Sequence, residues 1–145
     1  MLFRSSVSNF EKAVAEFFGS PYAVATDCCT HGIELCLRML QPDKLVIPAH
    51  TYLSIPMTAM KLGIPFIWKE DSNWASWYRL GGTNVIDAAT FWQKDGYMPH
   101  TYMCVSFQYK KHLSLGRGGV ILTDNPKSAQ LLGKMVYDGR SRDLP

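Results

Sequence analysis

The most informative part of the chain is Ser106-Phe107-Gln108-Tyr109-Lys110-Lys111-His112-Leu113-Ser114-Leu115-Gly116-Arg117-Gly118-Gly119. It follows an apolar run that reads as a strand, and its lysines are followed by Gly-x-Gly-Gly. This pattern suits a Schiff-base lysine on a turn with close backbone packing, since a lysine amine attacks an aldehyde only in its neutral form. The alternative is a solvated Lys-Lys pair ahead of a glycine-rich hairpin, and isolated glycine patterns do not decide between the two.

Around this stretch, short apolar strands alternate with amphipathic helices. Strands are predicted over 22–25, 45–47, 64–68, 84–86, 103–106 and 120–123, and helices over 8–18, 31–40, 52–62 and 127–137. This alternation predicts a three-layer α/β domain with a mostly parallel sheet. Ser8 is the expected N-cap of the first helix, and Pro56 an expected irregularity in the third. The Trp-rich segment 70–82 has no clear assignment.

Length and composition narrow the class of protein. The 145 residues suggest one domain, and 47% hydrophobic with 19% charged residues excludes a disordered chain. A net charge of +3 without a basic run argues against nucleic acid as a partner. No apolar stretch approaches the roughly 20 residues of a membrane span, and residues 1–10 lack a signal-peptide region. We therefore expect a cytoplasmic protein.

The four cysteines are Cys28, Cys29, Cys36 and Cys104. None sits in a Cys-x-x-Cys pair, and no nearby histidine completes a zinc pattern. We expect free thiols in a reducing compartment and no metal site. A reactive Cys28 or Cys29 is the alternative.

Three further segments carry candidate functional groups. Val85-Ile86-Asp87-Ala88-Ala89 puts a carboxylate at the carboxyl end of a buried strand, a functional position in open α/β sheets. Asp27 to Gly32 connects a strand to a helix, whose first amides favour an anion. Pro48 to Tyr52 places an aromatic ring just past a strand, where it could stack on a flat cofactor. Each has an ordinary structural alternative: a turn aspartate, a plain turn and a packing tyrosine.

Together these segments resemble the DegT/DnrJ/StrS family of pyridoxal-phosphate (PLP) dependent sugar aminotransferases, within the aspartate aminotransferase superfamily. The similar segments are Tyr22 to Ala25, Cys28 to Gly32, Pro48 to Tyr52, Gly63 to Phe66, Asp87 to Ala89 and Ser106 to Gly119. The last resembles the family pattern Ser-Phe-x-x-x-Lys-x-Leu-x-x-Gly-x-Gly-Gly at every fixed position, which assigns the Schiff base to Lys111 rather than Lys110. The resemblance covers about Phe10 to Gly139.

The resemblance implies an abbreviated fold-type-I PLP-dependent transferase large domain, with residues 1–145 as a single PLP-binding domain and the family's C-terminal substrate domain absent. It implies amino transfer from an amino acid donor to a nucleotide-linked keto-sugar, in a homodimer. Lys111 and Asp87 are the implied catalytic residues. The implied cofactor contacts are Cys29, Thr30, His31, Tyr52, Asp87, Thr90, Ser106 and Lys111. Among them, Asp87 would hold the pyridinium, Tyr52 would stack on the ring, and Thr30, the His31 amide and Ser106 would hold the phosphate.

The chain departs from the family pattern in ways that keep a second interpretation open. Cys29 replaces a turn glycine, so a strained positive φ is expected there. Thr90 and His112 replace a usual Gln or His and a usual Asn, and a strand–helix unit is missing between Phe66 and Val85. The missing layer would leave apolar surface uncovered, and Trp68, Trp74, Trp77 and Trp92 are candidates to cover it in a dimer. The alternative function is a non-catalytic PLP-fold remnant that binds or regulates a full-length aminotransferase.

Overall fold

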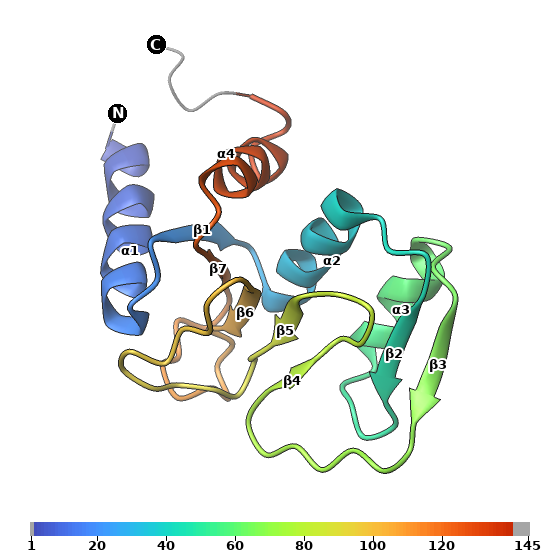
Figure 1. Ribbon diagram of the computed structural model, residues 1–145. Helices are drawn as coiled ribbons and strands as arrows, with labels where there is room; N and C mark the ends of the chain where they lie inside the picture. Colours follow the sequence, from blue (N-terminus) through green and yellow to red (C-terminus); the bar gives the residue numbers. More distant parts are fainter. Residues whose placement is uncertain (1, 141–145) are drawn as a thin grey trace.

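The structure, a computed structural model, describes residues 2–140 of the chain. In chain order the elements are α1 (Leu2–Phe18), β1 (Tyr22–Thr26), α2 (Cys29–Leu40), β2 (Leu45–Pro48), α3 (Ser54–Lys61), β3 (Phe66–Lys69), β4 (Tyr78–Arg79), β5 (Val85–Asp87), β6 (Tyr102–Ser106), β7 (Gly119–Thr123) and α4 (Pro126–Met135). The predicted α/β class is confirmed, and helices flank the strands throughout (Figure 1).

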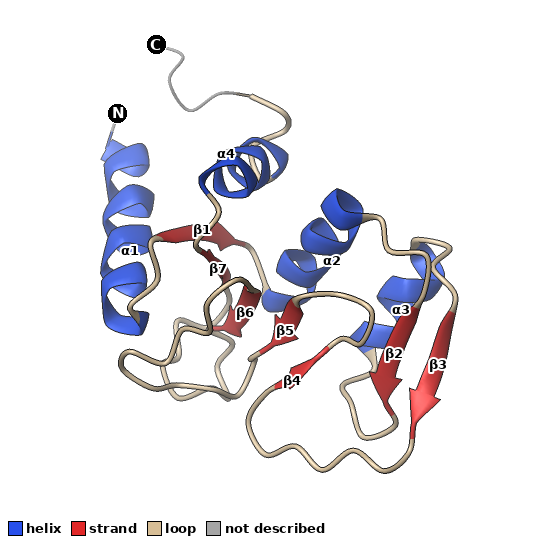
Figure 2. Ribbon diagram, viewed as in Figure 1, coloured by secondary structure: helices blue, strands red, loops and turns tan. Residues whose placement is uncertain are grey.

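Most strands form one sheet in the order β1-β7-β6-β5-β4, while β2 and β3 pair separately (Figure 2). The expectation of a mostly parallel sheet needs correction, because only β5–β6 and β2–β3 pair in parallel, and β1–β7, β6–β7 and β4–β5 pair antiparallel. The cause is that residues 107–118 join β6 to β7 without a crossover helix, so β7 turns straight back. Because β7 is antiparallel to both its neighbours, β1, β5 and β6 still point the same way.

The two-stranded unit meets the main sheet through one bridge, Val46 to Gly81. Val46 and Gly81 exchange backbone hydrogen bonds of 2.9 and 2.8 Å. A Cβ on Gly81 would lie 2.6 Å from Cβ of Val46, so only glycine permits this approach. The bridge makes β2 parallel in direction to β5, so its carboxyl end reaches the same edge of the molecule.

Successive residues of the central strands face two separate cores, which confirms the predicted three layers. Met103 and Val105 of β6 pack with Val14 and Phe18 of α1. Cys104, between them, faces the opposite core with α2, α3 and α4. Residues i and i+2 of a strand lie on the same face of the sheet. A strand that is covered on both faces is therefore apolar throughout rather than alternating. This is the case for β6 and β7, in which every residue is buried.

Several helix bounds differ from the prediction. Helix α1 begins at Leu2, so Ser8 lies inside it and is not its N-cap. Pro56 is the third residue of α3, where a missing N–H has no intrahelical partner to lose, and it causes no break. Cys29 is the first residue of α2 and is not among the residues with positive φ, so the expected strain there is absent.

Aromatic packing also changes one expectation about the tryptophans. Trp92 stacks on Phe17 at 4.6 Å and meets Phe18 edge-on at 5.1 Å, so it belongs to the core beneath α1. Trp68 and Trp77 are exposed. Within residues 2–140, no helix is both long enough and apolar enough to cross a membrane.

Candidate active site

A cavity of about 580 Å³ lies where the turns after β1, β2, β5 and β6 meet. The carboxyl ends of same-direction strands share one edge of a sheet, which is why these turns converge. Of the residues predicted to hold the cofactor, all but His31 line the cavity: Cys29, Thr30, Tyr52, Asp87, Thr90, Ser106 and Lys111. Residues up to 82 positions apart in sequence, Cys29 and Lys111, therefore contribute to one site.

Asp87 is the last residue of β5 and is only 7% exposed. Its Oδ2 accepts a 2.7 Å hydrogen bond from the hydroxyl of Tyr78, and its Oδ1 accepts a 3.0 Å bond from the Ala89 N–H. Burial raises the pKa of Asp87, and the hydrogen bonds and the positive charge of Lys111 only partly offset this effect. The carboxylate is thus a buried acceptor that lacks a full positive partner.

Lys111 ends the tight turn that follows β6, where its N–H donates to the Gln108 carbonyl at 2.9 Å. Its side chain is half-buried and lines the cavity, and its charge acts on Asp87. Within residues 2–140, no hydrogen bond or ion pair holds the Lys111 amine. Lys110, by contrast, is exposed, and its ammonium lies 5.4 Å from the centre of the Tyr109 ring. The geometry therefore favours Lys111 over Lys110.

The first turn of α2 forms one wall of the cavity. Thr30 points its hydroxyl to Ser54 at 3.1 Å, and the first amides of the helix are oriented toward this end. A Cβ on Gly119 would lie 2.5 Å from backbone atoms of Cys28 and Cys29. This contact gives the last glycine of Gly-x-Gly-Gly its physical reason: β7 must approach the helix start without a side chain.

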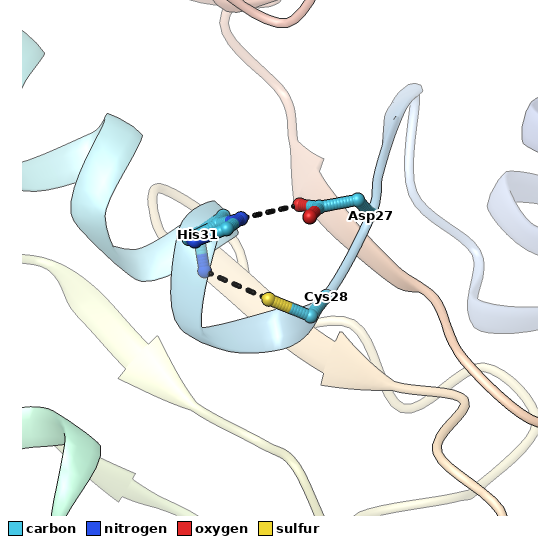
Figure 3. A group of neighbouring side chains, drawn as sticks. All are labelled: Asp27, Cys28 and His31. Carbon is cyan, nitrogen blue, oxygen red and sulfur yellow. Dashed lines mark hydrogen bonds and ion pairs between the residues drawn. The ribbon is translucent and has the colours of Figure 1, made fainter.

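Asp27, Cys28 and His31 gather at the start of α2 (Figure 3), and of the three only Cys28 lines the cavity. Nδ1 of His31 lies 2.6 Å from Oδ1 of Asp27, and Arg117 lies 3.0 Å from the other carboxylate oxygen. The His31 N–H donates to Sγ of Cys28 at 3.5 Å as a helix cap. Because His31 and Arg117 already engage the carboxylate of Asp27, we interpret the group as a helix cap rather than a metal site.

The cysteines are free thiols in the structure. Cys29 is buried and donates to the Cys104 carbonyl at 3.4 Å. Burial, together with the negative charge of Asp87, raises the pKa of the Cys29 thiol well above its usual value. A thiol held neutral in this way is a poor nucleophile, which argues against the reactive alternative for Cys29.

Two residues of the Trp-rich segment, Trp74 and Ser76, also line the cavity. Nε1 of Trp74 donates to the His50 carbonyl at 2.6 Å, and its ring lies 4.7 Å from that of Tyr78. Thr90 donates to the Ser76 carbonyl at 2.9 Å. Tyr52 is 70% exposed at the cavity, so it is not a packing tyrosine.

Sequence reasoning missed three residues that shape this site. Tyr78 and Trp74 lie in the segment without a recognisable period, and only the pairing of β4 with β5 brings Tyr78 to Asp87. Arg117 lies within the Gly-x-Gly-Gly motif and also lines the cavity. Its positive charge in that motif could have indicated a phosphate contact from the sequence.

Residues 4–68 match the sequence model of the DegT/DnrJ/EryC1/StrS aminotransferase family. Over these residues the chain is similar to this family. No curated protein matches the chain by sequence. The family match ends before Asp87 and Lys111, so these two residues rest on the motifs and the geometry.

Solved structures agree on the fold over almost the whole chain. A 3-amino-5-hydroxybenzoic acid synthase matches with a TM-score of 0.78 at 22% identity, over 96% of this chain and 48% of that one. DesI, solved with its TDP-sugar product, matches at 0.76 and 19%, over 96% and 46%. A Bacillus cereus protein described as a PLP-dependent aminotransferase matches at 0.77 and 16%, over 96% and 51%.

These matches assign the fold, which is that of a fold-type-I PLP-dependent transferase. The chain spans about half the length of the solved structures it matches. The cofactor implied by family and fold is pyridoxal phosphate.

Proposed function

We propose that the protein binds pyridoxal phosphate covalently through Lys111 and transfers an amino group from an amino acid donor to a nucleotide-linked keto-sugar. The observation that carries the proposal is the pairing of Lys111 with Asp87. Both line the same cavity and interact electrostatically: the carboxylate is buried, and the half-buried lysine amine has no hydrogen-bond partner among the described residues.

The residues present fit the cofactor chemically. Burial raises the pKa of Asp87, and a protonated pyridine nitrogen beside it would supply the missing positive charge. Each Asp87 oxygen already accepts one hydrogen bond, and a carboxylate oxygen has room for a second. Bound PLP supplies an electron sink, which depends on that pyridine proton. Asp87 is thus the residue that keeps the ring in its active form.

The opposite end of the cofactor needs an anion site. The first amides of α2, the Thr30 hydroxyl and the Ser106 hydroxyl offer donors at the cavity wall. Arg117 lines the same cavity and adds a positive charge near the helix start. Tyr52 is exposed and free to lie against a flat ring, and Cys29 and Thr90 complete the lining.

Lys111 would act twice in this scheme. Its amine would hold the cofactor through the aldehyde carbon, with water as the leaving group. In its neutral form, Nζ would also serve as the group in the cavity that takes up and gives back a proton, as general base and then acid. Trp74, held by its hydrogen bond to the His50 carbonyl, lines one side of this cavity.

The site should be tested by borohydride reduction of the PLP-treated protein, followed by peptide mass mapping. We expect the pyridoxyl group on Lys111. Lys110→Arg should keep the label and Lys111→Arg should lose it. A label on Lys110, or none, would refute the assignment.

The acceptor half of the reaction is tested separately. The donor half needs only the cofactor, Lys111, Asp87 and a small amino acid. The acceptor half must orient a large sugar, and positioning supplies much of the catalytic rate. We expect single-turnover conversion with glutamate or a similar donor, but slow amination of keto-sugar nucleotides unless a second chain, as in a homodimer, completes the site. Lack of even the donor half-reaction would favour the non-catalytic alternative.

A further inference from the structure

The hydroxyl of Tyr78 connects two side chains of the candidate site. Thr51 and Asp87 line the cavity, whereas the buried Tyr78 does not. The Tyr78 hydroxyl donates to Oδ2 of Asp87 at 2.7 Å and contacts the Thr51 hydroxyl, while Oδ1 of Asp87 accepts from the Ala89 N–H. A hydroxyl carries one proton, so a tyrosine that gives its proton to the carboxylate must accept from Thr51. The three side chains therefore form a chain of donors that ends on Asp87.

Burial fixes the direction of this chain. It raises the pKa of the Tyr78 hydroxyl, and the adjacent charge of Asp87 raises that pKa further, so the phenol keeps its proton throughout the physiological range. Tyr78 is consequently a donor to Asp87 and never a second anion beside it. A donor that points at a carboxylate stabilises its charged form more than its neutral form.

The segment that leads into β4 is fastened on both sides, which holds the Tyr78 hydroxyl in place. On one side, Nε1 of Trp74 donates to the His50 carbonyl in the turn after β2, and the Trp74 ring lies against that of Tyr78. On the other side, the hydroxyl of Thr90, in the turn after β5, donates to the Ser76 carbonyl. The position of the tyrosine is thus set by contacts within the chain.

The other titratable groups around Asp87 could not replace a lost donor. Burial raises the pKa of the Cys29 thiol, from α2, well above its usual value. A hydrogen bond with Cys36 and burial do the same for the Cys104 thiol, from β6, so both thiols stay neutral. Lys111 contributes a positive charge, but its amine makes no hydrogen bond to the carboxylate among the described residues.

We propose that Tyr78 is a positioning residue for the pyridine proton: its hydrogen bond holds Asp87 as a carboxylate, so that the proton between them stays on the ring nitrogen of the cofactor. This inference rests on the proposed function, which places that nitrogen beside Asp87. Without the tyrosine, the carboxylate would bind the proton more tightly itself, because burial already favours its neutral form. The ring would then lose the charge on which its action as an electron sink depends.

The first test uses the cofactor-free chain. Carbon NMR follows the titration of the Asp87 carboxyl group, and Asp87→Asn assigns the signal by its loss. We expect Tyr78→Phe to raise the midpoint by about one to two pH units, the size that corresponds to a lost hydrogen bond to a charged group. Thr51→Val should raise it by less, since its donation only strengthens the next bond in the chain.

Tyr102→Phe is the matched control for this titration. Tyr102 is also a buried tyrosine whose hydroxyl contacts one side chain, Ser128 of α4, and neither residue lines the cavity. Its loss should leave the Asp87 midpoint unchanged. A midpoint that moves in neither Tyr78→Phe nor Thr51→Val, or that moves equally in Tyr102→Phe, would overturn the inference.

The second test observes the ring nitrogen. Nitrogen NMR of the chain loaded with PLP that is labelled at the pyridine nitrogen distinguishes a protonated from a neutral ring. We expect a protonated ring in the unmodified protein and in Tyr102→Phe, and a shift toward the neutral position in Tyr78→Phe. A ring that is equally protonated in Tyr78→Phe would overturn the inference. Failure of the proposed function has a different signature: no signal from bound PLP, while the Asp87 midpoint of the cofactor-free variants still moves as expected.

Discussion

The hydroxyl of Tyr78 donates a 2.7 Å hydrogen bond to Oδ2 of Asp87, and the register of β4 and β5 sets these two residues directly opposite each other. The same hydroxyl contacts Thr51, which follows β2. One buried tyrosine thereby links the proposed pyridinium partner to the turn that carries Tyr52. The short strand β4 is the element that makes this link possible.

Tyr78→Phe should therefore weaken both the fold and the site. The change leaves Oδ2 of a buried carboxylate without its donor, and losing a hydrogen bond to a charged group typically costs about 1.5–3 kcal/mol. We expect the free energy of unfolding by urea to fall by an amount of this order. Tyr22→Phe, at an exposed tyrosine, is the control and should change it little. Equal stabilities for the two variants would show that the Tyr78 bond contributes nothing.

Asp87→Asn should keep PLP binding and lose most turnover. The amide can still accept from the Ala89 N–H and can donate to the Tyr78 hydroxyl, so the local packing is preserved. It cannot stabilise a protonated pyridine, so the electron sink weakens. The measurement is the rate at which glutamate converts bound PLP to its amine form, followed by absorbance. A rate equal to that of the unmodified protein would mean that Asp87 has no such role.

The same variant should change how stability depends on pH in cofactor-free protein. Burial raises the pKa of Asp87 in the folded state above its ordinary 3.8. At pH values between 3.8 and that raised pKa, the folded state therefore binds more protons than the unfolded state. Stability of the unmodified protein therefore falls as pH rises through that window and stays reduced above it. Asp87→Asn lacks this fall. We compare the free energy of unfolding by urea of Asp87→Asn with that of the unmodified protein. We expect the difference in favour of Asp87→Asn to be larger at about pH 7 than at about pH 3. A constant difference between the two proteins would contradict the raised pKa.

The parts of the fold that the sequence predicted are those with a strong local pattern. The continuous apolar runs of β6 and β7 identified both strands, and Gly63, with φ of 67°, ends the turn after α3 as its position suggested. Strand direction was not predictable in this way. Whether β7 pairs parallel or antiparallel depends on the connection before it, and a twelve-residue loop carries no periodic signal for or against a helix.

The candidate site shows the same division. Lys111 and Asp87 were predicted because each follows a strand inside a specific motif, and the structure brings both to one cavity. Tyr78 was not predicted as a site residue, because a strand of two residues has no recognisable alternation of apolar and polar side chains. The position of this strand is fixed by its pairing with β5. His31 was assigned through its amide, while its side chain is held outside the cavity by Asp27.

The last prediction concerns assembly. Leu53, Met57 and Met60 are spaced four and three residues apart, so they form one apolar stripe on α3, and Met57 and Met60 are 57% and 71% exposed. The stripe continues from Tyr52 at the cavity, and a small domain gains stability by covering such a surface with a second copy through a two-fold interface. We expect a dimer by light scattering at micromolar concentration, and we expect Met57→Lys/Met60→Lys to shift it to monomer. Leu131→Lys, at an exposed leucine on α4, should leave the dimer intact. A monodisperse monomer for the unmodified chain would contradict the prediction, and a dimer that survives the double change would place the interface elsewhere.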